Sequence, residues 1–433
     1  MDKAVLERRR RGVMQLMGEG IAVIPSAPHF VRNRDVYFGY RPDSDFYYLT
    51  GFAEPDTVAV LAPGREQGEF VLFCREKDPE KEVWDGRRAG LEGAVENHGA
   101  DDAFPIDDIN EILPGLLENR SKVFCNMGRY PDFDVKLINW LNQVKRKARA
   151  GVSAPGELVD LNYILHELRL VKRVEEIRVM KRAARVSAAA HRRAMQICKP
   201  GMMEYEIEAE IGYEFRRRGA SGPAYPSIVA GGRNACILHY TENTDELRDG
   251  ELLLIDAGAE VECYASDITR TFPVNGKYSP AQKVIYEVVL DAQRAAIKQV
   301  QPGNLWNQPH DAAVKVMVQA LVDLKLLQGE VDELIEKESY RRFYMHRTGH
   351  WLGMDVHDVG DYKVDGLWRL LEPGMTLTVE PGIYIPDDPD LDERWRNIGI
   401  RIEDDVLVTK DGHTIFSENV PKTVDEVEAL MAG

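Results

Sequence analysis

The sequence has few cysteines and no long apolar run, and each of these features excludes a class of protein. Its five cysteines are widely spaced and form no Cys-x-x-Cys pair, which argues against a disulfide framework or a thiolate metal site and favours free thiols in a reducing compartment. No apolar stretch approaches the ~20 residues that cross a bilayer. A basic run at residues 8–11 precedes Gln15 and Gly18 rather than an apolar segment, so it predicts a first helix and not a signal peptide. We expect a cytoplasmic protein with no membrane partner.

Positive charge is scarce as well. Lys and Arg number 55 against 72 Asp and Glu, for a formal net charge of −17. Nucleic-acid partners require clustered cations, so we expect none. A negative balance suits a cationic substrate such as a peptide amino terminus, although many enzymes are acidic. The 44% hydrophobic and 29% charged content indicates a globular protein, and 433 residues suffice for two domains.

Two common hydrolase signatures are missing. The chain contains neither the His-Glu-x-x-His pattern of zinc peptidases nor the Gly-x-Ser-x-Gly turn of serine hydrolases. Their absence removes the commonest peptidase mechanisms.

The residue pattern changes near residues 169–172. Before this point short apolar runs, predicted as strands at residues 21–24, 57–61, 70–73 and 122–125, alternate with helical patterns. After it a helix over residues 175–198 ends at Lys199-Pro200-Gly201, and a second helix covers residues 204–219. We expect an α/β amino-terminal domain over residues 1–172 and a second domain over residues 173–433.

The second domain repeats its own plan. A helix capped by Ser279 ends at Gln301-Pro302-Gly303, another helix follows at about residues 310–327, and each helix pair leads into strands with acidic residues. An internal duplication around a pseudo-two-fold axis predicts this order. Coincidence is the alternative, because Pro-Gly after a helix is common.

Acidic residues recur on the apolar strands of this domain. Asp256 follows the run LLLI, Glu380 follows LTV, and Glu403 lies in the alternating segment IRIEDD, where Arg401 should share its face of a strand. Asp267 lies eleven residues after Asp256, so a hairpin could bring both carboxylates together. One such acid could simply cap a turn. Four of them require a shared counter-charge, and two divalent cations would supply it by balancing the four negative charges.

Histidines gather in one segment. Three of the ten, His346, His350 and His357, fall within twelve residues, and His239 in ILHYTE is a further candidate. The other six are interpreted as structural. One imidazole with mainly carboxylate ligands makes an oxygen-rich site that suits Mn²⁺ first, then Co²⁺ or Zn²⁺. Two such ions ~3.5–4 Å apart would bridge a water and lower its pKa towards ~7, which provides a hydroxide nucleophile and predicts a hydrolase.

Five segments resemble, in order, the ligand motifs of the metallopeptidase family that contains aminopeptidase P, prolidase and methionine aminopeptidase. They are IDAG at 255–258, DITRT at 267–271, HWLG at 350–353, VEPG at 379–382 and RIED at 401–404. The segments YRPDSDFYYLTGF at 40–52 and HYTEN at 239–243 extend the likeness towards aminopeptidase P. The resemblance covers nearly the whole chain. It implies an aminopeptidase P amino-terminal domain followed by an α+β pita-bread catalytic domain with pseudo-two-fold symmetry.

The resemblance also implies a ligand set for two metal ions. Asp256, Asp267 and Glu403 would hold one ion. Asp267 and Glu403 would bridge to the other, which His350 and Glu380 would also bind.

Catalytic roles follow from the same resemblance. Glu380 would carry a proton from the bridging water, and His357 and His239 would stabilise the tetrahedral intermediate or position the substrate. Arg401 would orient the carboxylates, and His346 would support them. The residue after His346 is an arginine, where the family commonly has glycine.

The implied activity is removal of the first residue from peptides whose second residue is proline, in the cytoplasm, by a homodimer or homotetramer. Trp84 resembles a tryptophan that reaches a neighbouring subunit's pocket in this family. A prolidase limited to dipeptides would use the same ligands and is the alternative. A metal-free creatinase-like hydrolase would leave the ligands without purpose, and a non-catalytic binding protein of this fold would usually have lost some of them.

Overall fold

The apolar runs near the amino terminus form one mixed sheet. The computed structural model describes residues 1–433 and divides into two units, Met1–Leu168 and Arg169–Gly433. In the first unit the strand order is β6-β5-β4-β1-β7-β8. The bounds are β1 Ile21–Pro25, β4 Val58–Leu61, β5 Phe70–Cys74, β6 Asp102–Pro105, β7 Lys122–Cys125 and β8 Glu157–Asp160. β1 is antiparallel to β4 and parallel to β7.

The four strands predicted for this unit are confirmed as β1, β4, β5 and β7. The added strands, β6 and β8, lie at the two edges of the sheet, and their residues are half-buried or exposed. An edge strand buries less surface, so its sequence carries a weaker apolar pattern.

Helices and one exposed hairpin complete the first unit. The hairpin strands are β2 Val31–Asn33 and β3 Val36–Tyr37, and the helices are α1 Lys3–Met17, α2 Ser44–Thr50, α3 Pro79–Asp85, α4 Gly90–His98, α5 Ile109–Leu117, α6 Pro131–Lys145 and α7 Asn162–Leu170. An apolar core joins the sheet to α5 and α6 through Leu113, Leu117 and Trp140. The helix α7 carries the chain into the second unit.

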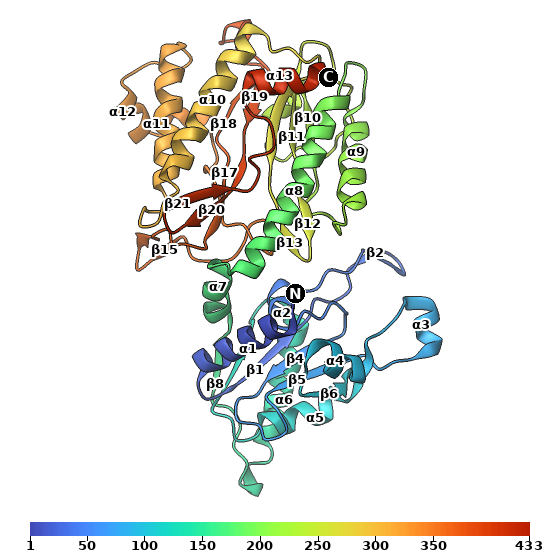
Figure 1. The fold of residues 1–433 in the computed structure, drawn as a ribbon. Helices are drawn as coiled ribbons and strands as arrows, with labels where there is room; N and C mark the ends of the chain where they lie inside the picture. The colour runs from blue at the N-terminus through green and yellow to red at the C-terminus, as the bar shows by residue number, and fades with distance from the viewer. The chain divides into compact units, whose positions relative to one another are not determined.

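Two helix pairs flank the strands of the second unit (Figure 1). The pairs are α8 Val174–Ile197 with α9 Glu204–Arg217, and α10 Pro280–Gln299 with α11 Gln308–Asp323. The Ser279 side chain caps α10 by accepting the Gln282 N–H. The helix α8 contacts β12 and β13, whereas α10 contacts β17, β18 and β19. Both halves therefore follow the order expected from the internal repeat.

The strands between these helices form several small sheets. Their bounds are β9 Gly222–Pro223, β10 Ile228–Gly231, β11 Leu252–Asp256, β12 Ala259–Val261, β13 Tyr264–Ala265, β14 Thr269–Pro273, β17 Thr376–Val379, β18 Gly382–Ile385, β19 Ile398–Arg401, β20 Asp404–Thr409 and β21 Gly412–Ile415. The sheet orders are β10-β11-β14, β13-β12-β9, β17-β20-β21 and β18-β19. The remaining elements are α12 Val331–Glu336, β15 Lys363–Val364, β16 Leu367–Trp368 and α13 Val424–Ala432.

The prediction that the alternating segment IRIEDD at residues 400–405 is one strand is wrong. β19 ends at Arg401 and β20 begins at Asp404, and the two strands belong to different sheets. The Glu403 N–H leaves the ladder and donates to the Thr269 carbonyl at 3.1 Å. The break exists because the backbone at this point turns from one partner strand to another.

The break occurs where two glutamates face each other. The pairs Val379–Asp404 and Gly382–Arg401 keep one register across it, which places Glu380 opposite Glu403. Like charges directly opposite on two strands repel each other. Pro381, between Glu380 and the first residue of β18, has no N–H to continue the ladder of hydrogen bonds. The sheet therefore opens at a point where two carboxylates need a common partner.

None of the helices combines the length and hydropathy needed to span a bilayer. The five cysteines are all free thiols, as predicted.

Candidate metal centre

Asp256 and Asp267 meet at the end of β11. β11 and β14 are antiparallel, with Asp256 opposite Thr269, and Asp267 lies just before β14. The Tyr225 hydroxyl lies 2.7 Å from Asp256 Oδ1 and also contacts Asp267 Oδ1. The structure thus brings together the two carboxylates that the sequence spacing paired.

Close backbone packing makes this approach possible. A Cβ added to Gly258 would lie 1.7 Å from the Ser266 carbonyl oxygen, so only glycine fits there. On α8, the His191 Nε2 atom lies 3.0 Å from the carbonyl oxygen of Ala257, the residue that follows β11. Burial lowers the pKa of His191 to about 4, so this ring is neutral. His191 has the structural role expected of it.

An imidazole and two glutamates complete the cluster. The His350 Nε2 atom lies 3.2 Å from Asp267 Oδ2 and 3.6 Å from Glu380 Oε1. The Thr269 hydroxyl donates to Glu403 Oε2 at 2.6 Å. One possible ligand atom from each of Asp267, His350 and Glu403 lies within 4.8 Å of the others. These three side chains can therefore reach one cation.

Negative charge exceeds positive charge within this cluster. Burial and the neighbouring carboxylates raise the pKa of Glu403 well above its usual range. Burial also raises the pKa of Glu380 to about 7. The pKa of Asp256 is raised by burial as well, although the Arg401 guanidinium, 2.7 Å from Asp256 Oδ2, opposes this shift. Carboxylates that share a buried site raise one another's pKa unless a cation joins them.

The His350 imidazole acts as a counter-ion in the protein alone. Burial lowers its pKa, but contacts with Asp267 and Glu380 outweigh burial and raise the pKa to about 9. For Asp267, burial raises the pKa, and the His350 contact reverses that effect, so the net pKa is lowered. A metal ligand must be the neutral imidazole, so a bound cation would replace this proton. Carboxylates with one imidazole are a donor set that fits a hard divalent metal ion.

A hydrogen-bonded network links Arg401 and His346 to the carboxylates. Arg401 donates to the Thr269 hydroxyl at 3.2 Å and to the Tyr384 hydroxyl at 3.0 Å. The His346 Nε2 atom lies 2.8 Å from the same tyrosine hydroxyl, and its Nδ1 atom lies 3.8 Å from Glu380 Oε2. Burial lowers the pKa of His346 to about 3, so this ring is a neutral hydrogen-bonding group.

Two further histidines lie beside this network. The ring centroids of His357 and His350 are 4.4 Å apart, and burial followed by the nearby His350 charge lowers the pKa of His357. His239 is exposed. Burial is the main cause of the lowered pKa of His346 and of His357, and positive charge on His239 is a smaller cause in both. The chain therefore groups all four candidate histidines in one region of the second unit.

Sequence reasoning missed three side chains that contact the cluster. They are Tyr225, Tyr384 and Asp405. The carboxylate of Asp405 accepts the Asp267 N–H at 3.1 Å, and it follows the RIED segment as a buried acid on a strand, which could have indicated it. The two tyrosines lie outside any chemical pattern in the sequence. Trp84, in α3 of the first unit, is 87% exposed.

Comparison with protein families places this arrangement in a known class. Residues 178–410, more than half of the chain, match the model of metallopeptidase family M24, and residues 6–124 match the aminopeptidase P amino-terminal domain. The chain belongs to metallopeptidase family M24. The predicted enzyme class, a metal-dependent peptidase, is confirmed by this membership.

Full-length relatives of this M24 peptidase are known. It is 46% identical over 433 residues to the Xaa-Pro aminopeptidase of Escherichia coli (strain K12), covering 100% of this chain and 98% of the relative. Its structure matches that of Pseudomonas aeruginosa aminopeptidase PepP with a TM-score of 0.99 at 58% identity, covering 100% and 98% of the two chains. Zinc-substituted E. coli aminopeptidase P in complex with product matches with a TM-score of 0.97 at 45% identity, with coverages of 100% and 98%.

These matches confirm the predicted fold class. The α/β amino-terminal domain is followed by an α+β pita-bread catalytic domain with pseudo-two-fold symmetry.

Proposed function

We propose that this chain removes the first residue from peptides whose second residue is proline. Its likeness to Xaa-Pro aminopeptidases extends over the full length of the chain. The observation that carries the proposal is that the five side chains proposed as metal ligands lie in one buried cluster. These are Asp256, Asp267, His350, Glu380 and Glu403. A non-catalytic relative would have no reason to keep five polar groups in a buried, mutually repulsive cluster.

We infer that two divalent metal ions belong to this cluster, with Mn²⁺ as the first choice and Co²⁺ or Zn²⁺ as alternatives. Asp256, Asp267 and Glu403 would hold one ion, and Asp267, Glu403, His350 and Glu380 the other. When bound, the ions would supply a water of lowered pKa and stabilise negative charge on the substrate carbonyl. The raised pKa of Glu403 and Glu380 supports this inference, because cations would offset the repulsion that causes it.

The surrounding side chains would then act on the substrate. Glu380 would take a proton from the attacking water and return it to the leaving proline nitrogen. His357 and His239 would donate hydrogen bonds to the carbonyl oxygen as it gains charge. Arg401 orients Asp256 through the 2.7 Å contact, and His346 would hold the Tyr384 hydroxyl in place.

The remaining assignments concern the assembly and its setting. We infer a cytoplasmic homodimer or homotetramer in which Trp84 of one subunit contributes to the substrate pocket of another. Its high exposure in the single chain supports a contact of that kind. We place the boundary of the catalytic domain after residue 172. The first compact unit ends at Leu168, and the M24 match begins at residue 178.

Substitution at the cluster tests the metal assignment. We expect Glu380→Gln to lower turnover of an Xaa-Pro-Xaa tripeptide about 10²–10⁴-fold with Mn²⁺ supplied, and His350→Ala to lower the bound metal below two ions per chain. Glu372→Gln, at an exposed position eight residues from Glu380, is the matched control and should keep full activity. Normal turnover in Glu380→Gln would refute the proposed site.

Product analysis separates this activity from that of a prolidase. Purified protein is incubated with matched Xaa-Pro and Xaa-Pro-Xaa peptides, and the released amino acid is measured. Release of the first residue from the tripeptide supports the proposal. Cleavage of the dipeptide alone would assign the chain as a dipeptidase.

A further inference from the structure

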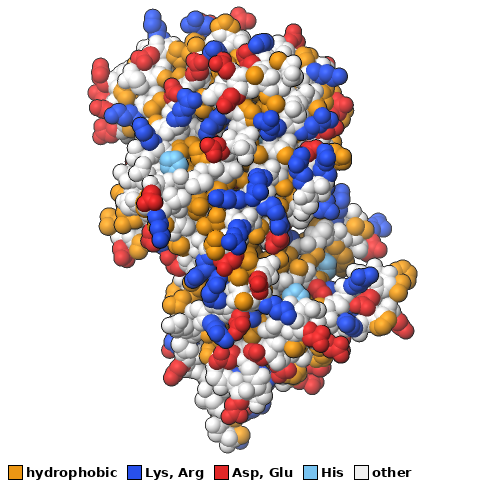
Figure 2. Space-filling view, in the orientation of Figure 1, with side chains coloured by type: hydrophobic (Ala, Val, Ile, Leu, Met, Phe, Trp, Pro, Cys, Tyr) orange, Lys and Arg blue, Asp and Glu red, His pale blue; other side chains and the backbone are white.

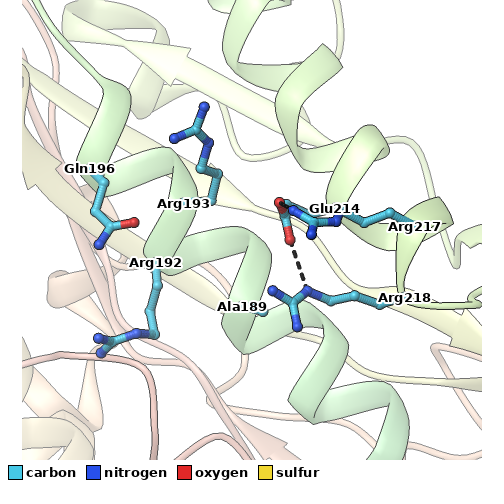
Figure 3. A pocket seen from close by; sticks show the side chains of 7 residues that line it. All are labelled: Ala189, Arg192, Arg193, Gln196, Glu214, Arg217 and Arg218. Carbon is cyan, nitrogen blue, oxygen red and sulfur yellow. Dashed lines mark hydrogen bonds and ion pairs between the residues drawn. The ribbon is translucent and has the colours of Figure 1, made fainter.

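An arginine-lined pocket lies between α8 and α9, outside the metal centre. Its volume is about 320 Å³. Arg192 and Arg193 of α8 line one side, and Arg217 and Arg218 at the end of α9 line the other, together with Glu214 (Figure 3). Figure 3 shows the Arg218 guanidinium extending from α9 towards α8 near Ala189.

The pocket arises from the spacing of residues on both helices. The lining positions are 189, 192, 193 and 196 of α8, and 214 and 217 of α9 with its C-cap residue 218, and they recur at intervals of three and four residues. Such intervals define one face of a helix. Facing stripes of two packed helices are normally apolar. Here both stripes carry arginines, so like charges line the pocket from both helices.

Carboxylates of the chain only partly neutralise these arginines. The buried Glu214 accepts from Arg217 at 3.0 Å and from Arg218 at 2.8 Å, and this use of both oxygens holds the two guanidinium groups in place. Arg193 pairs with Glu210 at 3.2 Å, whereas Arg192 has no acidic partner. Four arginines and one carboxylate, Glu214, therefore line the pocket.

This local excess of positive charge stands out in a chain of net charge −17. Figure 2 shows Lys and Arg side chains gathered along the α8 face of the second unit. Repulsion among them would be relieved by an anion carrying about two charges. A phosphomonoester carries about −1.5 to −2 at pH 7.

We propose that this pocket binds the phosphate group of a small phosphomonoester. Arginine is suited to this because its planar fork pairs with two phosphate oxygens at once, and all four cations of the pocket are arginines. The volume is about ten times a water molecule's ~30 Å³ share of the liquid, which leaves room for a small organic group beside the phosphate. It also falls at the lower end of the range of small-molecule sites, ~300–1,000 Å³.

The pocket uses a different face of α8 from the metal centre. Ser187 and His191 point inward and contact Ala259 N and the Ala257 carbonyl, next to the Asp256 strand end. Arg192 and Arg193 are exposed. An anion held by them would not compete with the peptide for the metal-binding carboxylates.

Isothermal titration of the full-length, metal-loaded protein with glycerol 3-phosphate tests the proposal, with inorganic phosphate as a second probe. We expect saturable binding with a Kd on the order of 1 mM or tighter. Arg192→Gln should weaken it about tenfold, since it removes one charge-assisted contact. Arg185→Gln is the matched control, because Arg185 is also an exposed α8 arginine without an acidic partner; it should change the Kd less than twofold.

The outcomes separate the phosphate site from general charge attraction. Equal weakening by Arg185→Gln and Arg192→Gln, or the absence of saturable binding, would overturn the proposal. Binding to vesicles that contain phosphatidic acid, with none to glycerol 3-phosphate, would overturn the assignment to a free small molecule. Because neither variant removes a partner from the buried Glu214, both should fold, and unchanged thermal unfolding confirms this.

Discussion

Asp358 joins the loop that follows His350 to the start of the second unit through buried ion pairs. Its Oδ1 atom lies 2.6 Å from Arg169 Nη2, and its Oδ2 atom lies 2.8 Å from Lys172 Nζ. All three side chains are at most 2% exposed. The Asp358 N–H also donates to the Trp351 carbonyl at 2.9 Å, which closes the loop that follows His350.

The change Asp358→Asn keeps the shape of this side chain and removes its charge. Removing one partner of a buried ion pair costs about 3–5 kcal/mol, because the other charge stays buried. Arg169 retains a second partner, Asp355, at 2.8 Å, so most of the cost falls on Lys172. We therefore expect the lower end, about 3 kcal/mol. For a unit of this size that corresponds to a Tm lower by roughly 6–12 °C.

Calorimetry of the metal-loaded protein measures this loss, and Asp361→Asn is the control. Asp361 belongs to the same segment but is exposed, so its neutralisation should change Tm by less than about 2 °C, as for surface substitutions in general. Hydrogen exchange over residues 350–358 should be faster in Asp358→Asn alone. If both variants lose the same Tm, the buried ion pairs do not hold this loop and the reasoning fails.

The pH dependence of the same difference provides a second check. Burial raises the pKa of Asp358, but Lys172 and Arg169 outweigh it and hold the pKa below its usual value. A lowered folded-state pKa contributes stability that is present above the unfolded value, ~3.9, and is lost as pH falls through the folded value. The Tm gap between Asp358→Asn and the unsubstituted protein should therefore stay constant from about pH 8 to 5 and narrow only below about pH 4.

Three further predictions follow from other parts of the second unit. Glu204 is buried and accepts four hydrogen bonds, including one from Tyr240 at 2.8 Å. Glu204→Gln should speed hydrogen exchange in the adjoining segment of His239 and lower kcat/KM about tenfold. Glu208→Gln should change neither quantity, and equal effects of the two substitutions would contradict this prediction. A Cβ at Gly349 would lie 2.0 Å from a β17 carbonyl oxygen, so Gly349→Ala should lower the free energy of unfolding by about 1–3 kcal/mol. Gly212 lies inside α9 with open space around it, so Gly212→Ala should raise the free energy of unfolding by about 0.5–1 kcal/mol. Calorimetry of both variants tests these opposite signs. Removal of metal by a chelator should abolish turnover and lower Tm, because the clustered carboxylates lose their counter-charge, and an unchanged Tm would argue against a metal among them.

Local pattern in the sequence was sufficient for much of this architecture. The helix, Pro-Gly, helix order could be seen twice in the sequence, because each helix buries one apolar stripe and its apolar residues therefore recur with a period of about 3.6. The acids at the ends of apolar runs were visible for a related reason, since an uncompensated charge at such a position is costly. Asp256 and Glu380 could therefore be recognised as candidates before any contact was known, and the family motifs identified His350 among its neighbours.

Tertiary structure decided what depends on register and on contacts between distant residues. The ladder interruption that sets Glu380 opposite Glu403 follows from the pairing of two strands with partners in different sheets. The Tyr225 hydroxyl reaches Asp256 across 31 residues, and the arginine pocket requires α8 to lie against α9. The sequence by itself determined which elements form and which faces they bury, because those properties are periodic along the chain. Only the folded chain could decide which polar groups meet, because meeting depends on how separate elements pack.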